Sequence, residues 1–191
     1  DHVGAIPYLE KNYNAKIIGT PYTLEVLKTL ARDEQIEFKN ELVPTKAGTS
    51  VQVSRNIRIE LIAMTHSTLD AATVAIHTPE GIVLYTNDFK LDNKPTLGAK
   101  PNLKRLKEIG NTGKVRALIL DSLYCAKKGK TPSESVAKEM LKDVLLGEEN
   151  TGHALFLTSF ASHIARLKSM VEFGKKLNRK IVFMGRSLSK Y

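Results

Sequence analysis

The order of apolar segments after residue 114 is the feature that most constrains the fold of this chain. Largely apolar runs at 115–120, 154–157 and 180–184 alternate with stretches of helical periodicity at 131–146 and 162–176. Strands that alternate with helices favour a parallel sheet with helical crossovers. The run at 115–120 is typical of a strand that is covered on both faces. We therefore expect an α/β fold in this half of the chain.

The residues before 115 predict further strands and a hairpin. Residues 57–63 alternate apolar and polar side chains, as a half-buried strand does. Pro79-Glu80-Gly81 separates two β-rich runs, at 73–77 and 82–86, and these turn residues predict a hairpin. The same criteria predict a short strand at 16–19 and a helix with one apolar face at 23–32.

Helix start and stop signals frame the two helices after residue 130. In Thr131-Pro132-Ser133-Glu134 the threonine can cap the helix, the proline suits its first position and the glutamate completes a capping box. Gly147 is expected to end this helix. Ser162 is the expected cap of the next one.

Charge and cysteine content indicate which partners and which cellular compartment to expect. The chain has 29 Lys and Arg against 20 Asp and Glu, a net charge of +9. A basic surface concentrates polyanions, so nucleic acid is favoured over lysines that only aid solubility. The sequence contains neither an apolar run of about 18 residues nor a basic amphipathic helix. We therefore do not expect contact with a membrane. The single cysteine, Cys125, cannot form an intrachain disulfide, which favours a cytoplasmic protein.

Imidazole and carboxylate groups follow several of the predicted strands. His66, Asp88 and Asp121 each lie just past a strand end, and Asp1-His2 opens the chain. Open sheets place their sites at such ends, and these side chains are the ligands that a hydrolytic Zn²⁺ site needs. A single Asp or His at a strand end is more often a turn former or faces solvent. Their combination favours a metal-dependent hydrolase.

Short segments around these residues occur in the order of known motifs. Asp1-His2-Val3-Gly4 and the residues that follow match the end of an HxHxDH motif, and Thr65-His66-Ser67 matches a third metal motif. Residues 85–90 match a fourth, with Asn87 where glycine is more common. These segments resemble the metal motifs of the ribonuclease J family, which belongs to the metallo-β-lactamase/β-CASP group.

Three later segments extend the resemblance over nearly the whole chain. Leu120-Asp121-Ser122 resembles the first β-CASP motif, residues 158–166 resemble the segment that faces RNA, and Gly185-Arg186-Ser187 resembles a following turn. The residue choices are closest to archaeal members. The resemblance implies part of a metallo-β-lactamase αββα sandwich at 1–115. It implies part of a β-CASP lobe, with a parallel sheet and crossover helices, at 116–191.

The resemblance also assigns roles to individual residues. Asp1 and His2 would bind one zinc ion, His66 would bind the other, and Asp88 would bridge the two. Asp121 would orient a histidine that transfers a proton. The residues implied to contact RNA are Ser122, Ser159, Ser162, His163 and Arg166.

The implied activity is hydrolysis of RNA phosphodiesters by a zinc-dependent 5′–3′ exonuclease, with endonuclease cleavage as a second mode. A homodimer is expected for the full-length protein. Because the chain starts inside a metal motif, we expect a fragment that is inactive and binds zinc weakly by itself. Two alternatives stay open: a metallo-β-lactamase-type hydrolase of another substrate, and a non-enzymatic β-CASP subunit that binds RNA.

Overall fold

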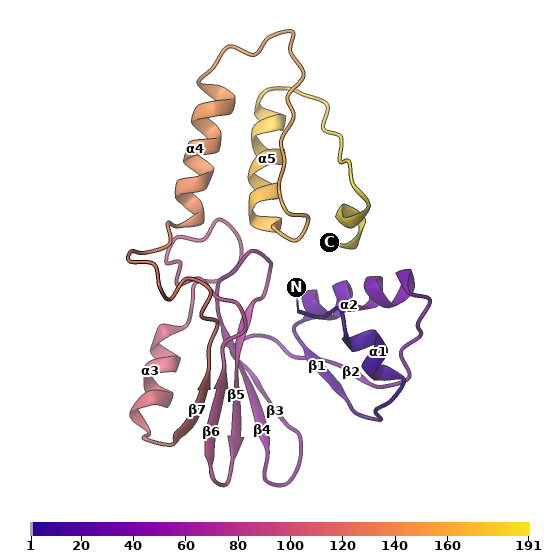
Figure 1. The fold of residues 1–191 in the computed structure, drawn as a ribbon, viewed down its shortest axis with the longest axis vertical. Helices are drawn as coiled ribbons and strands as arrows, with labels where there is room; N and C mark the ends of the chain where they lie inside the picture. The colour runs from indigo at the N-terminus through magenta and orange to yellow at the C-terminus, as the bar shows by residue number, and fades with distance from the viewer. Residues whose placement is uncertain (1) are drawn as a thin grey trace.

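The structure is a computed structural model that describes residues 2–191. Its largest unit is a five-stranded sheet in the order β3-β4-β5-β6-β7 (Figure 1). The strands from β3 to β6 run antiparallel to their neighbours, and β7 pairs parallel with β6. Their bounds are Ser50–Gln52, Arg58–Ala63, Ala72–Thr78, Gly81–Tyr85 and Val115–Ile119.

The hairpin between β5 and β6 is confirmed at its predicted place. Thr78 and Gly81 pair across it, so Pro79 and Glu80 form the turn. Gly81 adopts a φ of +142°, and a Cβ there would lie 2.5 Å from the Lys114 carbonyl oxygen. The turn requires glycine at this position both for its conformation and for space.

One face of the sheet is covered by α3, Leu103–Asn111. The Asn102 side chain caps this helix by accepting a hydrogen bond from the Arg105 amide at 3.0 Å. The buried cluster beneath the helix consists of Ile62, Ala75, Ile82, Leu84 and Ile109. These residues come from three neighbouring strands and the helix, so burying them stabilises the sheet and the helix together.

A charged network ties α3 to the sheet at the edge of this core. Arg105 donates from Nε to Glu60 Oε1 at 2.6 Å and from Nη2 to Oε2 at 3.1 Å. His77 Nε2 lies 2.9 Å from the same Oε2 atom. The Glu60 side chain is 11% exposed. The cost of removing this carboxylate from water is therefore offset by two paired hydrogen bonds to the guanidinium.

Glu60 is expected to make the fold sensitive to acid. The hydrogen bonds from Arg105 lower the pKa of the Glu60 carboxyl from 4.5 to about 2. A carboxyl with a lowered pKa in the folded state stabilises the fold above its unfolded pKa, and this contribution disappears as the pH falls from 4.5 to about 2. We expect roughly 2 kcal/mol, because solvent around the half-exposed Arg105 screens part of the attraction.

Urea denaturation of the wild type and Glu60→Gln at a series of pH values would measure this contribution. The difference in unfolding free energy between the two proteins should be largest near neutral pH and should shrink toward pH 2. Glu108→Gln is the matched control, because Glu108 also pairs with Arg105, at 3.0 Å, but is 48% exposed. A difference between wild type and Glu60→Gln that stays constant with pH would contradict the assignment.

A second unit precedes the sheet and contains α1 (Ile6–Glu10), β1 (Ile17–Gly19), α2 (Pro21–Asp33) and β2 (Leu42–Pro44). The two short strands pair in parallel. Leu24, Leu27 and Ala31 of α2 are buried, which confirms the predicted apolar face. In α1, the buried Glu10 carboxylate accepts hydrogen bonds from the Lys39 and Asn40 amides and so anchors the residues before β2.

The last part of the chain contains α4 (Glu134–Leu146), α5 (Ile164–Lys176) and the 3-10 helix η1 (Arg186–Lys190). α4 and α5 lie side by side (Figure 1). Lys138 of α4 and Glu172 of α5 join them through an ion pair of 2.6 Å. η1 returns to the first unit, where Lys190 Nζ lies 3.2 Å from Asp33 Oδ2.

The sheet predicted for the last part of the chain is wrong for the described residues. The parallel pairing stops at β7, and residues 154–157 and 180–184 belong to no strand. Phe156 and Met184 are 88% and 81% exposed. The strand at 115–119 is also not covered on both faces, since Leu118 is 58% exposed. A strand needs a backbone partner, and within residues 2–191 nothing pairs with these segments.

The expected helix caps are wrong by one or two residues. Ser133 caps α4 by accepting from the Ser135 amide, so Thr131 lies outside the helix and Glu134 is its first residue. His163 caps α5 through its side chain, in place of Ser162. Both predicted C-terminal ends hold, at Gly147 for α4 and at Lys176 for α5. Cap sites shift easily because neighbouring polar residues compete for the same amides.

Membrane-spanning helices are absent from the part of the chain that the structure describes. Each of its helices is too short or too polar to cross a bilayer.

Candidate metal centre

Asp88 lies directly beyond β6 and contacts the first described residue of the chain. Its Oδ2 atom is 2.8 Å from His2 Nε2, although the two residues are 86 positions apart. The hydrogen bond from His2 lowers the pKa of Asp88 below its ordinary value. A carboxylate that stays ionised is available to bind a cation.

Asn87 sets the direction in which the chain leaves β6. It adopts a φ of +53°, in the left-handed region. Its side-chain amide donates to the Ala72 carbonyl at 2.9 Å, which holds the turn against β5. Asparagine tolerates this conformation better than other residues with a side chain. A left-handed residue is thus needed here, which agrees with the expectation from the motif resemblance that glycine could occupy this position.

His66 lies in the loop that follows β4, next to the segment that contains Asp88. An isolated β-bridge between Thr65 and Lys90 joins the two loops. His66 Nδ1 is 3.2 Å from Ser67 Oγ. Burial lowers the pKa of His66, and the charges of Asp88, His2 and Asp121 also act on it. A neutral imidazole is the form that binds a metal ion.

Asp121 lies just beyond β7, which pairs with β6. The Thr86 amide donates to the Ile119 carbonyl at 3.0 Å, so the two strand ends are adjacent. The Asp121 side chain is exposed, and its Oδ1 atom accepts from the Leu123 amide at 2.9 Å. Asp121 therefore lies near enough to act electrostatically on His66, while its carboxylate also shapes its own turn.

Of the predicted metal ligands, only His2 and Asp88 are in direct contact, and both act electrostatically on His66. The three residues come from separated segments, and Asp1 lies outside the described residues. Among residues 2–191, no group of three or more His, Cys, Asp or Glu side chains is close enough to hold a metal ion. The chemical types of these donors nevertheless suit Zn²⁺, since two imidazoles and one carboxylate are present.

The residues predicted to contact RNA divide into two groups. Ser122 and Ser159 are exposed. Ser162, His163 and Arg166 are half-buried at the start of α5, and the Arg166 guanidinium forms two hydrogen bonds with Glu134. The Ala165 amide donates to the Ser67 carbonyl at 3.2 Å. The first turn of α5 is thereby placed beside the loop that contains His66.

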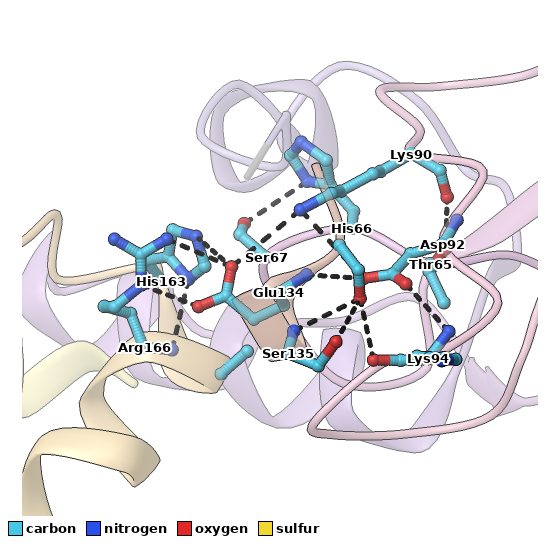
Figure 2. A network of polar contacts seen from close by, with 12 residues as sticks. Thr65, His66, Ser67, Lys90, Asp92, Lys94, Glu134, Ser135, His163 and Arg166 are labelled. Atoms are coloured by element: carbon cyan, nitrogen blue, oxygen red, sulfur yellow. Dashed lines mark hydrogen bonds and ion pairs between the residues drawn. The ribbon is translucent and has the colours of Figure 1, made fainter. Parts of the chain in front are cut away.

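Polar residues that no sequence pattern predicted connect these two regions. Lys90, Asp92 and Glu134 form a network between the loop of His66 and the start of α5 (Figure 2). Glu134 had a predicted role only in a capping box. The available signal was the pair of acidic residues, Asp92 and Glu134, in segments that are otherwise rich in lysine.

Comparisons with known proteins show which family this chain is similar to. Residues 152–191 match the family profile "Ribonuclease J, beta-CASP domain". The whole chain is 46% identical to a ribonuclease J of Pyrococcus abyssi and 40% identical to one of Methanocaldococcus jannaschii. It is 34% identical to a ribonuclease J of Helicobacter pylori. It spans 43% of the length of each archaeal relative and 27% of the bacterial one.

A solved structure shows the same fold at low sequence similarity. This protein of unknown function from Enterococcus faecalis superposes with a TM-score of 0.58 at 17% identity. The match covers 81% of this chain and 38% of the other one. The sequence matches along the full chain and the β-CASP match at its end agree with the resemblance in the metal motifs. Along its whole length the chain is therefore similar to less than half of each ribonuclease J relative, and residues 152–191 match the β-CASP domain of that family.

Proposed function

We propose that the protein containing this chain is a metal-dependent ribonuclease that hydrolyses RNA phosphodiesters from the 5′ end, with endonuclease cleavage as a second mode. The observation that supports it most is the placement of His66. Its loop lies within the electrostatic reach of His2 and Asp88 and is also hydrogen-bonded to the first turn of α5. Candidate metal ligands and a candidate phosphate-binding turn are thereby neighbours.

The proposed metal is a pair of zinc ions. His2, together with Asp1, would hold one ion, His66 would hold the other, and the two oxygens of Asp88 would face both. The ions would supply Lewis acidity to a phosphodiester that is otherwise a poor electrophile. The chain itself keeps its ligands in suitable protonation states, because the pKa values of both Asp88 and His66 are lowered.

The remaining proposed roles concern RNA and proton transfer. Asp121 would orient a histidine that transfers a proton. The hydroxyls of Ser122, Ser159 and Ser162 would bind phosphate oxygens, as would His163 and Arg166. The net charge of +9 would attract the RNA backbone over a longer range.

The proposal includes the architecture and setting of the full-length protein. Residues 1–115 would belong to a metallo-β-lactamase αββα sandwich, and residues 116–191 to the β-CASP domain. The full-length protein would be a cytoplasmic homodimer. The 191 residues alone would be inactive, because an incomplete shell leaves charged ligands without the coordination that offsets their desolvation.

An assay of the zinc-loaded, full-length protein on two substrates tests the proposed function. Short RNA with a 5′ phosphate should be shortened from that end, whereas a thioester should remain intact. Removal of the metal by a chelator should stop RNA cleavage, and zinc should restore it. Thioester hydrolysis without RNA cleavage would favour another metallo-β-lactamase-type hydrolase. RNA binding without cleavage would favour a non-enzymatic subunit.

A further inference from the structure

A buried carboxylate at the start of α4 contacts side chains from two other segments. The Glu134 side chain is 7% exposed. Arg166 donates to it from Nε at 2.6 Å and from Nη2 at 3.0 Å. Lys90 Nζ and His163 Nε2 lie 3.9 and 3.7 Å from its Oε2 atom. In Figure 2, Glu134 lies between Arg166 and His163 on one side and Asp92 on the other.

Asp92 provides a second buried carboxylate that fastens α4 to the loop after β6. Its side chain is 2% exposed. Its Oδ2 atom accepts from the Glu134 amide and its Oδ1 atom accepts from the Lys94 amide, each at 2.8 Å. The hydroxyl of Ser133 donates to the Lys94 carbonyl at 2.9 Å. The first residues of α4 are therefore held by this loop as well as by their own helix.

The same loop is bonded to the segment that contains His66. The Lys90 amide donates to the Thr65 carbonyl at 2.8 Å, and the Asp92 amide donates to the Thr65 hydroxyl at 3.2 Å. On the other side of His66, the Ser67 carbonyl accepts from the Ala165 amide at 3.2 Å. The residues flanking His66 are thus connected to α5 both directly and through Lys90, Asp92 and Glu134.

Glu134 is the anion that the basic side chains at the start of α5 and in the loop after β6 share. A buried charge is tolerated when it is paired and hydrogen-bonded, and removing one partner leaves the others uncompensated. Without the carboxylate, Arg166 and Lys90 would lose the anion that lies between them. His163 cannot replace it, since an imidazole carries no negative charge and its Nδ1 atom already accepts from the Arg166 amide at 3.3 Å as the helix cap. The first turn of α5 would then move relative to the loop of His66.

We propose that Glu134 is a positioning residue that holds the first turn of α5 against the loop of His66. The inference rests on the proposed function, in which Ser162, His163 and Arg166 on this turn bind RNA. A displacement of about 1 Å between a bound substrate and the reacting groups can cost about 100-fold in rate. Glu134 would therefore control cleavage of RNA although it touches neither the RNA nor the metal ligands.

The test compares two substrates with the zinc-loaded, full-length protein and its Glu134→Gln variant. One substrate is 5′-phosphorylated RNA, and the other is bis(p-nitrophenyl) phosphate, whose single phosphate cannot occupy the metal site and a phosphate site on α5 at the same time. On RNA, kcat should fall roughly 10- to 100-fold, the range seen when a residue that orients another group is lost. On the small diester, the fall in kcat should be at least about 10-fold smaller.

Glu172→Gln is the matched control for this test. Glu172 pairs with Lys138 across the same two helices but has no hydrogen bond to the loop of His66 or to Lys90. Its kcat values on both substrates should match those of the wild type. An equal loss on both substrates in Glu134→Gln would overturn the inference, since it would indicate damage to the metal site or to the whole fold. An unchanged kcat on RNA would also overturn it.

A second variant and the wild-type activity distinguish a failure of the Glu134 inference from misfolding and from a failure of the proposed function. If Glu134→Gln does not fold, Glu134→Asp keeps the charge but shortens the side chain, and a loss of kcat confined to RNA is again expected. Wild-type kcat on RNA in Glu134→Asp would contradict the positioning role. A wild-type protein that cleaves neither substrate would reject the proposed function itself, which separates that failure from a failure of the Glu134 inference.

Discussion

Replacing Asp88 with alanine is expected to reduce RNA hydrolysis by the full-length protein more than about 100-fold. Loss of a residue that only orients a metal ligand costs about 10- to 100-fold, so loss of a proposed bridging ligand should cost more. Asp88 lies 2.8 Å from His2 and acts electrostatically on His66, so its removal affects both candidate zinc ions. RNA binding should be largely kept, because the proposed phosphate contacts lie elsewhere.

Turnover of 5′-phosphorylated RNA, zinc content and RNA affinity would be measured for Asp88→Ala beside Asp143→Ala. Asp143 is exposed on α4 and pairs with none of the proposed ligands. The control should match the wild type in all three measurements. Turnover at the wild-type rate in Asp88→Ala would show that Asp88 is not a ligand of the catalytic metal. Loss of RNA binding would show that Asp88 contributes to the fold of the binding surface.

Replacing Ile62 with alanine is expected to destabilise the full-length protein by about 3 kcal/mol. Ile62 is 1% exposed and belongs to the cluster between β4, β5, β6 and α3. The smaller side chain loses apolar burial and leaves a cavity that a packed core fills only in part. Because β4 and β6 lead directly to the loops of His66 and Asp88, this cluster also supports the candidate metal centre.

Ile57→Ala is the matched control for the core prediction. Ile57 lies one residue before β4 and is 37% exposed, so its truncation should cost less than about 1 kcal/mol. Both values would come from urea denaturation followed by circular dichroism. A cost for Ile62→Ala no greater than that for Ile57→Ala would mean that the cluster beneath α3 is not the main core of this sheet.

Local patterns predicted the antiparallel part of the fold well. The alternation at 57–63 gives β4, and the turn at Pro79-Glu80-Gly81 gives the hairpin of β5 and β6. These elements depend on contacts between neighbours in sequence and on a glycine conformation that few other residues adopt. The periodicity of α2, α4 and α5 also predicted their extents to within about three residues.

Strands that depend on distant partners were not predictable in the same way. Residues 154–157 and 180–184 have the composition of buried strands, but composition does not reveal whether a pairing partner exists. Within residues 2–191 they remain unpaired, and Phe156 and Met184 are exposed. Among the described residues, the apolar strand β7 likewise has a pairing partner only on its β6 side.

The candidate metal centre was predicted through motif resemblance and strand ends together. Residue spacing alone does not bring His2 to Asp88, because the two are 86 positions apart. The fold does so by placing His2 beside the end of β6. The network of Lys90, Asp92 and Glu134 was missed because ion pairs between distant segments leave no local pattern. Arg166, predicted to bind RNA, is held by this network.

The most direct test of the central claim is a crystal structure of the zinc-loaded, full-length protein, with zinc located by anomalous scattering. We expect two neighbouring zinc ions, with nitrogens of His2 and His66 each about 2.0–2.1 Å from one ion and a carboxylate oxygen of Asp88 about 2.0–2.2 Å from each. Zinc bound elsewhere, or His66 and Asp88 both outside the coordination shell of the bound ions, would contradict this claim.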